Sequence, residues 1–244
     1  MSNRRIMRLE GPDTRKFLQD LVTNDVAGLD DGLVYAALLT PQGKFLTDFF
    51  LALDGDSVLL DLPEAAADAT IKRLTMYKLR ANVTISESGR HLQRGTGTPP
   101  DGAYADPRHP DMGWRMYSNA PESDDGTEWD AIRVEHCIPE CGIELGEDSY
   151  ILEAGFEALN GVDFRKGCYV GQEVTARMKH KTELRKGLRQ VSLDAPVPVG
   201  TSILSGEKPV GTVFTQSGGR GIAYLRFDRI SEDMTADGVA MRAE

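Results

Sequence analysis

The sequence has too few cysteines for a framework of disulfides. Cys137, Cys141 and Cys168 are the only three in 244 residues, whereas disulfide-stapled domains are short and rich in cysteine. Cys137 and Cys141 lie close together, but no second pair of cysteines or histidines accompanies them at a zinc-binding spacing. We therefore expect free thiols in a reducing compartment and no metal site.

The chain also lacks long apolar runs and any excess of basic residues. No apolar stretch is long enough to cross a bilayer, and the basic start Met1–Arg5 leads into no apolar signal region. The formal net charge is −10, so most of the surface would repel a polyanion such as DNA. These absences predict a cytoplasmic protein that binds neither membranes nor nucleic acids, while local positive charge stays compatible with a small anionic ligand.

The first part of the chain alternates helical and strand patterns. Asp13 or Thr14 can cap a first helix, and Thr40–Gly43 has the composition of a turn between two strands. This order of elements predicts an α+β fold with a mainly antiparallel sheet. The predicted elements are a helix within 11–22, strands at 33–39, 44–53 and 57–62, a helix from Pro63 toward Lys78 and a strand at 82–87.

The sequence pattern of the second part differs between its beginning and its end. Residues 94–127 have the composition of loops around short strands, and residues 127–136 show helical spacing. From Leu188 onward, short apolar pieces alternate with glycine and proline turns, which predicts a small all-β module of barrel type. We therefore predict two domains, residues 1–187 and residues 188–244.

The densest cluster of unusual residues lies in the middle of the second half. A helix is predicted to begin near Gln172, and both a helix start and nearby cations stabilise a thiolate over a thiol. Cys168 is therefore predicted to be acidic and reactive, although a small buried residue in a glycine-permitted turn is the alternative. The cluster comprises Arg165, Lys166, Gly167, Cys168, Tyr169, Val170, Gly171, Gln172, Glu173 and Arg177.

Residues 166–173 resemble the signature of the YgfZ-type folate-binding proteins, which are similar to the T-protein (aminomethyltransferase) of the glycine cleavage system. The resemblance runs in order along nearly the whole chain. It implies ferredoxin-like modules with antiparallel sheets and a C-terminal β-barrel, arranged around a central folate-binding channel. The further segments that carry it are 11–26, 40–44, Asp106–Arg108, Gly113–Arg115, Arg133–Ile143, Leu152–Phe156, and Gly211, Gly221, Ala223 and Arg226.

The resemblance also implies a ligand, tetrahydrofolate or a derivative, and residues that hold it. The pterin-recognising carboxylate of the T-protein lies in a segment that matches Glu153, and one carboxylate can accept two adjacent N–H groups. Arg133 or Arg177 can pair with the anionic folate tail. Ordinary surface roles are the alternative for all three. The remaining candidate ligand residues are Lys166, Gly167, Tyr169, Gly171, Gln172 and Glu173.

Two positions depart from the transferase pattern. The T-protein uses an acidic pair in its first hairpin, where this chain has Thr47-Asp48, and Cys168-Tyr169 replaces an Asp-Phe type of sequence. A thiol does not carry the proton chemistry of a carboxyl group, so ordinary aminomethyl transfer is not expected. Asp48 remains a second catalytic candidate, with a solvent-facing strand position as the alternative.

The function implied is a tetrahydrofolate-binding accessory protein for the assembly or repair of iron–sulfur clusters. Cys168 is its candidate catalytic thiol, and folate and iron–sulfur client or assembly proteins are its expected partners. A folate-dependent aminomethyl or one-carbon transferase or demethylase is the alternative from another class. A module that binds folate only for structure or sensing is the third.

Overall fold

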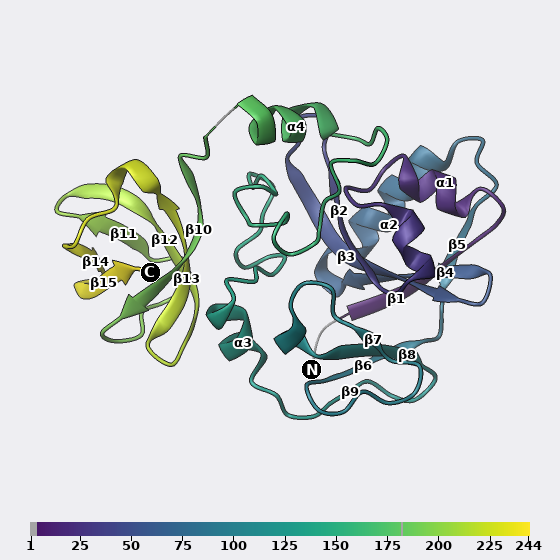
Figure 1. Cartoon of the computed structure of the whole chain (residues 1–244), viewed down its shortest axis with the longest axis horizontal. Coiled ribbons are helices and arrows are strands. Elements are labelled where there is room, and N and C mark those ends of the chain that lie inside the picture. Colours follow the sequence, from purple (N-terminus) through teal and green to yellow (C-terminus); the bar gives the residue numbers. More distant parts are fainter. Residues whose placement is uncertain (1–3, 182) are drawn as a thin grey trace. The chain divides into compact units, whose positions relative to one another are not determined.

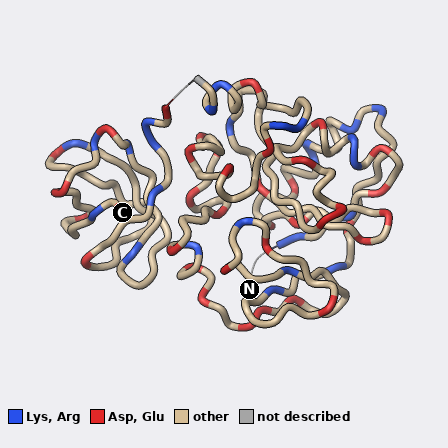
Figure 2. Tube along the Cα trace, in the orientation of Figure 1, with Lys and Arg blue, Asp and Glu red and all other residues tan. Residues whose placement is uncertain are grey.

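The computed structural model describes residues 4–181 and 183–244, except for the side chain of Lys181. These residues form two compact units. Unit 1 is the chain up to Thr127 together with Glu157–Ala176, and unit 2 is Glu128–Phe156 together with Arg177–Glu244. Acidic and basic residues are interspersed on both (Figure 2).

Unit 1 is built on a five-stranded antiparallel sheet in the order β2-β3-β4-β1-β5 (Figure 1). Alternation along β2 and β3 sends Ala36, Leu38 and Phe49 into an apolar core and Tyr35 and Asp48 to the opposite face. The elements are β1 (Arg4–Glu10), α1 (Thr14–Gln19), the 3-10 helix η1 (Val26–Asp30), β2 (Val34–Leu39), β3 (Phe45–Asp54), β4 (Ser57–Pro63), α2 (Glu64–Lys78) and β5 (Thr84–Glu87).

A second sheet of unit 1 has the strand order β7-β8-β6-β9. Its strands are short because glycine, proline and aspartate interrupt the segment. They are β6 (His91–Gly95), β7 (Tyr104–Ala105), β8 (Trp114–Ser118) and β9 (Ser123–Asp124), with the 3-10 helix η2 (Pro110–Met112) before β8.

Unit 2 contains a closed six-stranded barrel in the order β10-β13-β12-β11-β14-β15. Val191, Ile203, Val213, Ala223 and Met241 fill its interior. The other elements are α3 (Trp129–Glu135), the end of α4 (Gln172–Lys181), β10 (Lys186–Leu193), β11 (Ser202–Ser205), β12 (Lys208–Ser217), β13 (Arg220–Arg226), the 3-10 helix η3 (Phe227–Arg229), β14 (Met234–Ala236) and β15 (Val239–Ala243).

The predicted fold class is confirmed, with antiparallel sheets and a C-terminal β-barrel. The strand β1 was not predicted, since its three arginines do not resemble a strand pattern, yet it pairs with β4 and β5. The central channel and the division into residues 1–187 and 188–244 remain predictions. No helix of the described residues is long and apolar enough to span a membrane.

The barrel depends on the absence of a side chain at Gly211, which is opposite Leu225 in the β12–β13 ladder. A Cβ atom there would lie 2.0 Å from the backbone oxygen of Tyr224. Gly211→Ala should therefore lower the free energy of unfolding by about 1–3 kcal/mol in urea titrations, as overpacking does. Gly146→Ala is the control, because a Cβ atom at Gly146 meets nothing within 4 Å. Equal stability of the two variants would contradict this packing argument.

Candidate functional site

The signature segment is anchored at its start by Lys166, which is buried with 7% of its surface exposed. Its Nζ donates to the backbone oxygens of Gln19 at 2.7 Å, Val22 at 2.5 Å and Asn24 at 3.0 Å. Burial lowers the pKa of Lys166 to about 8, so the group is still mostly an ammonium at neutral pH and has three N–H donors. Lys166 therefore satisfies backbone carbonyl oxygens at and after the end of α1, and it links the signature segment to this part of the chain.

The segment is anchored again at its other end. Gly171 has φ of 85°, and a Cβ atom there would lie 2.7 Å from the backbone oxygen of Thr40 and 3.1 Å from the Cα of Gly43. The segment thus packs directly on the turn of the β2–β3 hairpin, where only glycine fits. α4 then begins at Gln172, as predicted, and Thr175 Oγ1 donates back to the Gly171 oxygen at 3.2 Å.

Between these anchors, Gly167 and Cys168 are exposed while Lys166 and Tyr169 on either side are buried. The alternative of a buried packing cysteine is therefore wrong. Cys137 differs, because burial raises the pKa of its thiol to about 11. Among the three cysteines, Cys168 alone is exposed.

The cations expected to face the thiol have other partners. Lys166 points to the three backbone oxygens, and the Arg165 guanidinium lies 3.4 Å from the carboxylate of Asp163 with 91% of its side chain exposed. Of the other predicted ligand residues of the segment, Gln172 donates weakly to the Gly167 oxygen at 3.4 Å. Glu173 and Arg177 are exposed on α4.

Glu153 lies in a turn of unit 2 and is 8% exposed, so it is not the helix-surface carboxylate of the alternative reading. Tyr224 Oη donates to its Oε2 at 2.5 Å, and Lys186 Nζ lies 3.8 Å from the same oxygen. Burial and then the bond to Glu153 raise the pKa of Tyr224. No protein donor is recorded for Oε1 within the described residues, which leaves one carboxylate oxygen available.

Tyr224 and Lys186 were missed by the sequence reasoning. Both come from barrel strands, and Tyr224 is 71 residues from Glu153 along the chain. The start of β10 also holds Glu153 directly, since Leu188 N donates to its backbone oxygen at 2.8 Å.

Arg133 is not placed to bind a folate tail. It is 3% exposed, and its guanidinium contacts protein acceptors from every nitrogen. Nε donates to the Ile138 oxygen, Nη1 contacts Asp130 and Glu140, and Nη2 contacts Glu144 and Thr215. The N–H donors of this guanidinium are thus directed at protein acceptors. We therefore leave Arg133 out of the proposed ligand site.

Asp48 is buried at 4% exposure, which corrects the solvent-facing alternative. Tyr35 Oη donates to its Oδ2 at 2.8 Å, while Oδ1 is buried with no hydrogen-bond partner among the described residues. Burial raises the pKa of Asp48, and the positive charges of Arg4 and Arg108 oppose the shift.

Asp48 borders a buried ionic network that joins the two sheets of unit 1. Asp61 accepts from Arg4 at 2.6 Å and from Arg115 at 2.8 Å, and Asp106 accepts from Arg115 at 3.1 Å and from Arg108 at 2.7 Å. Burial alone would raise the pKa of Asp106, but the two guanidiniums lower it to about 2. The segments Asp106–Arg108 and Gly113–Arg115 are thus parts of one structural network.

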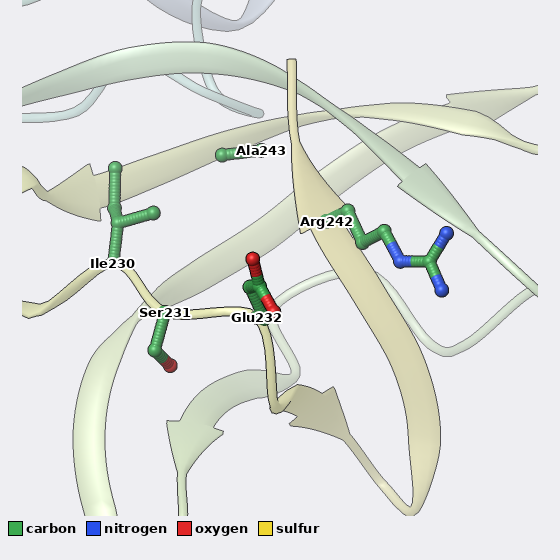
Figure 3. A pocket seen from close by; sticks show the side chains of 5 residues that line it. All are labelled: Ile230, Ser231, Glu232, Arg242 and Ala243. Carbon is green, nitrogen blue, oxygen red and sulfur yellow. The ribbon is translucent and has the colours of Figure 1, made fainter.

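One cavity of unit 2 lies on the barrel, away from the candidate site residues. It has a volume of about 650 Å³ and is lined by five barrel residues, of which Glu232 and Arg242 are charged (Figure 3). The Arg242 side chain extends away from the other four. None of the residues that the sequence singled out lines it.

Comparison with known proteins identifies the family. A family model described as CAF17, C-terminal beta-barrel domain, matches residues 185–244. The mitochondrial iron-sulfur cluster assembly factor IBA57 of Mus musculus is 30% identical over an alignment that covers 94% of this chain and 77% of the relative. The human IBA57 protein is 31% identical over an alignment that covers 89% of this chain and 71% of the relative.

This chain belongs to the IBA57 family. The IBA57 homologue of Mycosarcoma maydis is 32% identical over an alignment of 223 positions, which covers 78% of this chain and 55% of the relative. The chain thus spans about half the length of such fungal members of the family. A crystal structure of the glycine cleavage system aminomethyltransferase T from Bartonella henselae superposes with a TM-score of 0.78 over 100% of this chain and 83% of that one. At 16% identity, this confirms the T-protein fold.

The expectation of a cytoplasmic location is wrong. The IBA57 relatives from fungi, mouse and human are all named as mitochondrial. The expectation rested on the absence of an apolar signal region, whereas mitochondrial targeting segments are amphipathic rather than apolar.

The exposure of the three thiols predicts their order of reaction. Iodoacetamide at pH 7 should modify Cys168 first and Cys137 slowest, because burial raises the pKa of Cys137 to about 11 and leaves it almost no thiolate. Peptide mapping by mass spectrometry over time measures this. In urea the three rates should converge. Faster labelling of Cys137 than of Cys168 in the folded protein would contradict the exposure that the structure gives these two thiols.

Proposed function

We propose that this protein assists the assembly or repair of iron–sulfur clusters, with Cys168 as its working thiol. The observation that carries the proposal is the exposure of Cys168 between two anchored residues, Lys166 and Gly171. The names of the IBA57 relatives, which are iron-sulfur cluster assembly factors, support the choice of cargo.

The chemistry follows from the ligands that clusters take. Cysteine thiolates bind the iron atoms, usually four to a cluster. The signature segment offers one thiol, so the remaining ligands must come from an assembly partner or a client protein. Because the anchors at Lys166 and Gly171 already order the segment, binding through Cys168 loses little conformational freedom.

We further propose tetrahydrofolate or a derivative as a ligand at Glu153, as expected of a YgfZ-type relative. The residues present fit such a group. Glu153 is buried, Oε2 is oriented by Tyr224 and Lys186, and Oε1 keeps its acceptor capacity. When bound, the folate would supply a carrier for one-carbon units. The protein would hold its aminopyrimidine N–H groups on the carboxylate.

The alternative of a one-carbon transferase has less support. Asp48, the acid that would serve it, is enclosed beside Tyr35 and the ionic network. An acid in that position acts in packing and in hydrogen bonding within unit 1.

A test in cells can distinguish the loss of the Cys168 thiol from a loss of stability. In a strain lacking the protein, Cys168→Ala should fail to restore the activity of iron–sulfur enzymes, whereas wild type and the control Cys141→Ala should restore it. Cys168 is exposed, so its truncation should leave the melting temperature unchanged. Full restoration by Cys168→Ala would reject the thiol as the working group.

Folate binding is tested by calorimetry with tetrahydrofolate. Glu153→Gln should weaken the affinity about tenfold or more, because a charge-assisted hydrogen bond is worth about 1.5–3 kcal/mol. Glu147→Gln, which changes an exposed glutamate of the same unit, is the control. Equal affinities for the two variants would remove Glu153 from the site.

A further inference from the structure

We propose that the second half of α2, together with the two residues that follow it, is a docking surface for an acidic protein partner. The surface, called the α2 patch below, comprises Lys72, Arg73, Met76, Leu79 and Arg80. The proposal rests on the proposed function, because the partner is inferred to be a protein that gives or receives the cluster.

The charge of the α2 patch is unbalanced. Its three cations, Lys72, Arg73 and Arg80, form no ion pair with the described part of the chain. The arginines of β1, by contrast, all have carboxylate partners. No acidic residue occurs between Asp68 and Glu87. In a chain of net charge −10, this is a local concentration of positive charge that complements an acidic surface.

The α2 patch also exposes apolar side chains. Met76 is 56% and Leu79 88% exposed, the latter the most exposed large hydrophobic residue of the described chain. Leu79 has φ of 35° and ψ of −93°, a conformation that costs a leucine free energy and that persists where the surroundings or a function demand it. Cations around the helix end suit its dipole, but the dipole does not call for a strained leucine in water.

A hollow beside the α2 patch can receive a side chain. It has a volume of about 410 Å³, with Tyr77, Arg80 and Ala81 on the α2 side and Phe17, Leu21, Asp13, Lys16 and Asp20 on the α1 side. Its lining combines apolar side chains with two cations, Lys16 and Arg80, and two aspartates. Aromatic residues and arginine are enriched at the anchor positions of protein interfaces.

The hollow also leads toward the signature segment. A second hollow of about 390 Å³ shares Lys16 and Asp20 with the first and is lined by Gln19. The backbone oxygen of Gln19 accepts from Lys166, two residues before Cys168. A partner seated on α2 and α1 therefore approaches the segment that carries the thiol.

A protein fits these features better than an anionic membrane. Each cation near such a membrane contributes only about 1 kcal/mol, and the net charge of −10 opposes approach of the whole chain. A flat bilayer surface also leaves the hollow unfilled.

The first test measures iron–sulfur enzyme activity in a strain lacking the protein. The test variants are Leu79→Gly and the double substitution Arg73→Glu/Arg80→Glu. Lys208→Glu on the exposed barrel surface is the control for charge, and Cys168→Ala tests the proposed function. Leu79→Gly removes a strained side chain, so the melting temperature should hold or rise, while restored activity should fall at least about threefold, as for an interface anchor.

Full activity from both test variants would overturn the docking surface. If Cys168→Ala is inactive in the same experiment, the proposed function stands without it; if Cys168→Ala is also fully active, both are rejected. A fall with Lys208→Glu equal to that of the double variant would show a general charge effect and would also overturn the α2 patch.

The second test addresses the partner. A benzoylphenylalanine placed at Met76 should cross-link in cells to a protein through an acidic peptide, and the Arg73→Glu/Arg80→Glu background should abolish that product. A neutral or basic contacted peptide would overturn the proposal. Sedimentation with phosphatidylglycerol vesicles, absent with phosphatidylcholine vesicles and lost in the double variant, would assign the surface to a membrane instead.

Discussion

The buried ammonium of Lys166 is the interaction on which the candidate site depends. It links the signature segment to three carbonyl oxygens of residues 19–24, which are 142 to 147 residues away along the chain. Burying a cation is unfavourable unless its donors are satisfied, and three short hydrogen bonds meet that condition. The exposed Cys168, two residues on, is held by this contact on one side and by the close packing of Gly171 on the other. The Cys168 side chain is thereby exposed while its backbone is held in place, whereas exposed loop residues are usually mobile.

Buried charged groups also link separate elements elsewhere in both units. In unit 1, Asp61 and Asp106 hold the arginines that join the two sheets. In unit 2, Glu144 accepts from Arg133 and from Thr215, and so ties α3 and the loop after it to the barrel. Removing one member of such a group would leave a buried charge unpaired, which is the costly change. Most charged residues of the motifs thus form contacts inside the protein. The groups that can still bind a ligand or a metal are the exposed Cys168 thiol and the free acceptor of the Glu153 carboxylate, and the proposed chemistry uses these two.

Much of the fold could be predicted because it is encoded locally. The turn at Thr40–Gly43, the start of α4 at Gln172 and the first four barrel strands each follow from nearby turn residues and periodicity. The strand β1 could not, since its arginines find their carboxylates only in the folded sheet. The sequence also could not tell which way a motif residue points. Lys166, Arg133 and Asp48 were all predicted to serve a ligand or a reaction, but all three are buried. Tyr224 contacts Glu153 because the fold of the barrel brings the two residues together.

Amide hydrogen exchange of a Lys166→Met variant tests the anchoring of Cys168 most directly. The variant keeps the apolar stem and removes the donors, so residues 164–171 and 19–24 should exchange faster than in wild type while the barrel strands are unchanged. Lys208→Met, at an exposed barrel position, serves as the reference. Unchanged protection of both segments in Lys166→Met would contradict the account, because the loop would then be ordered without its ammonium.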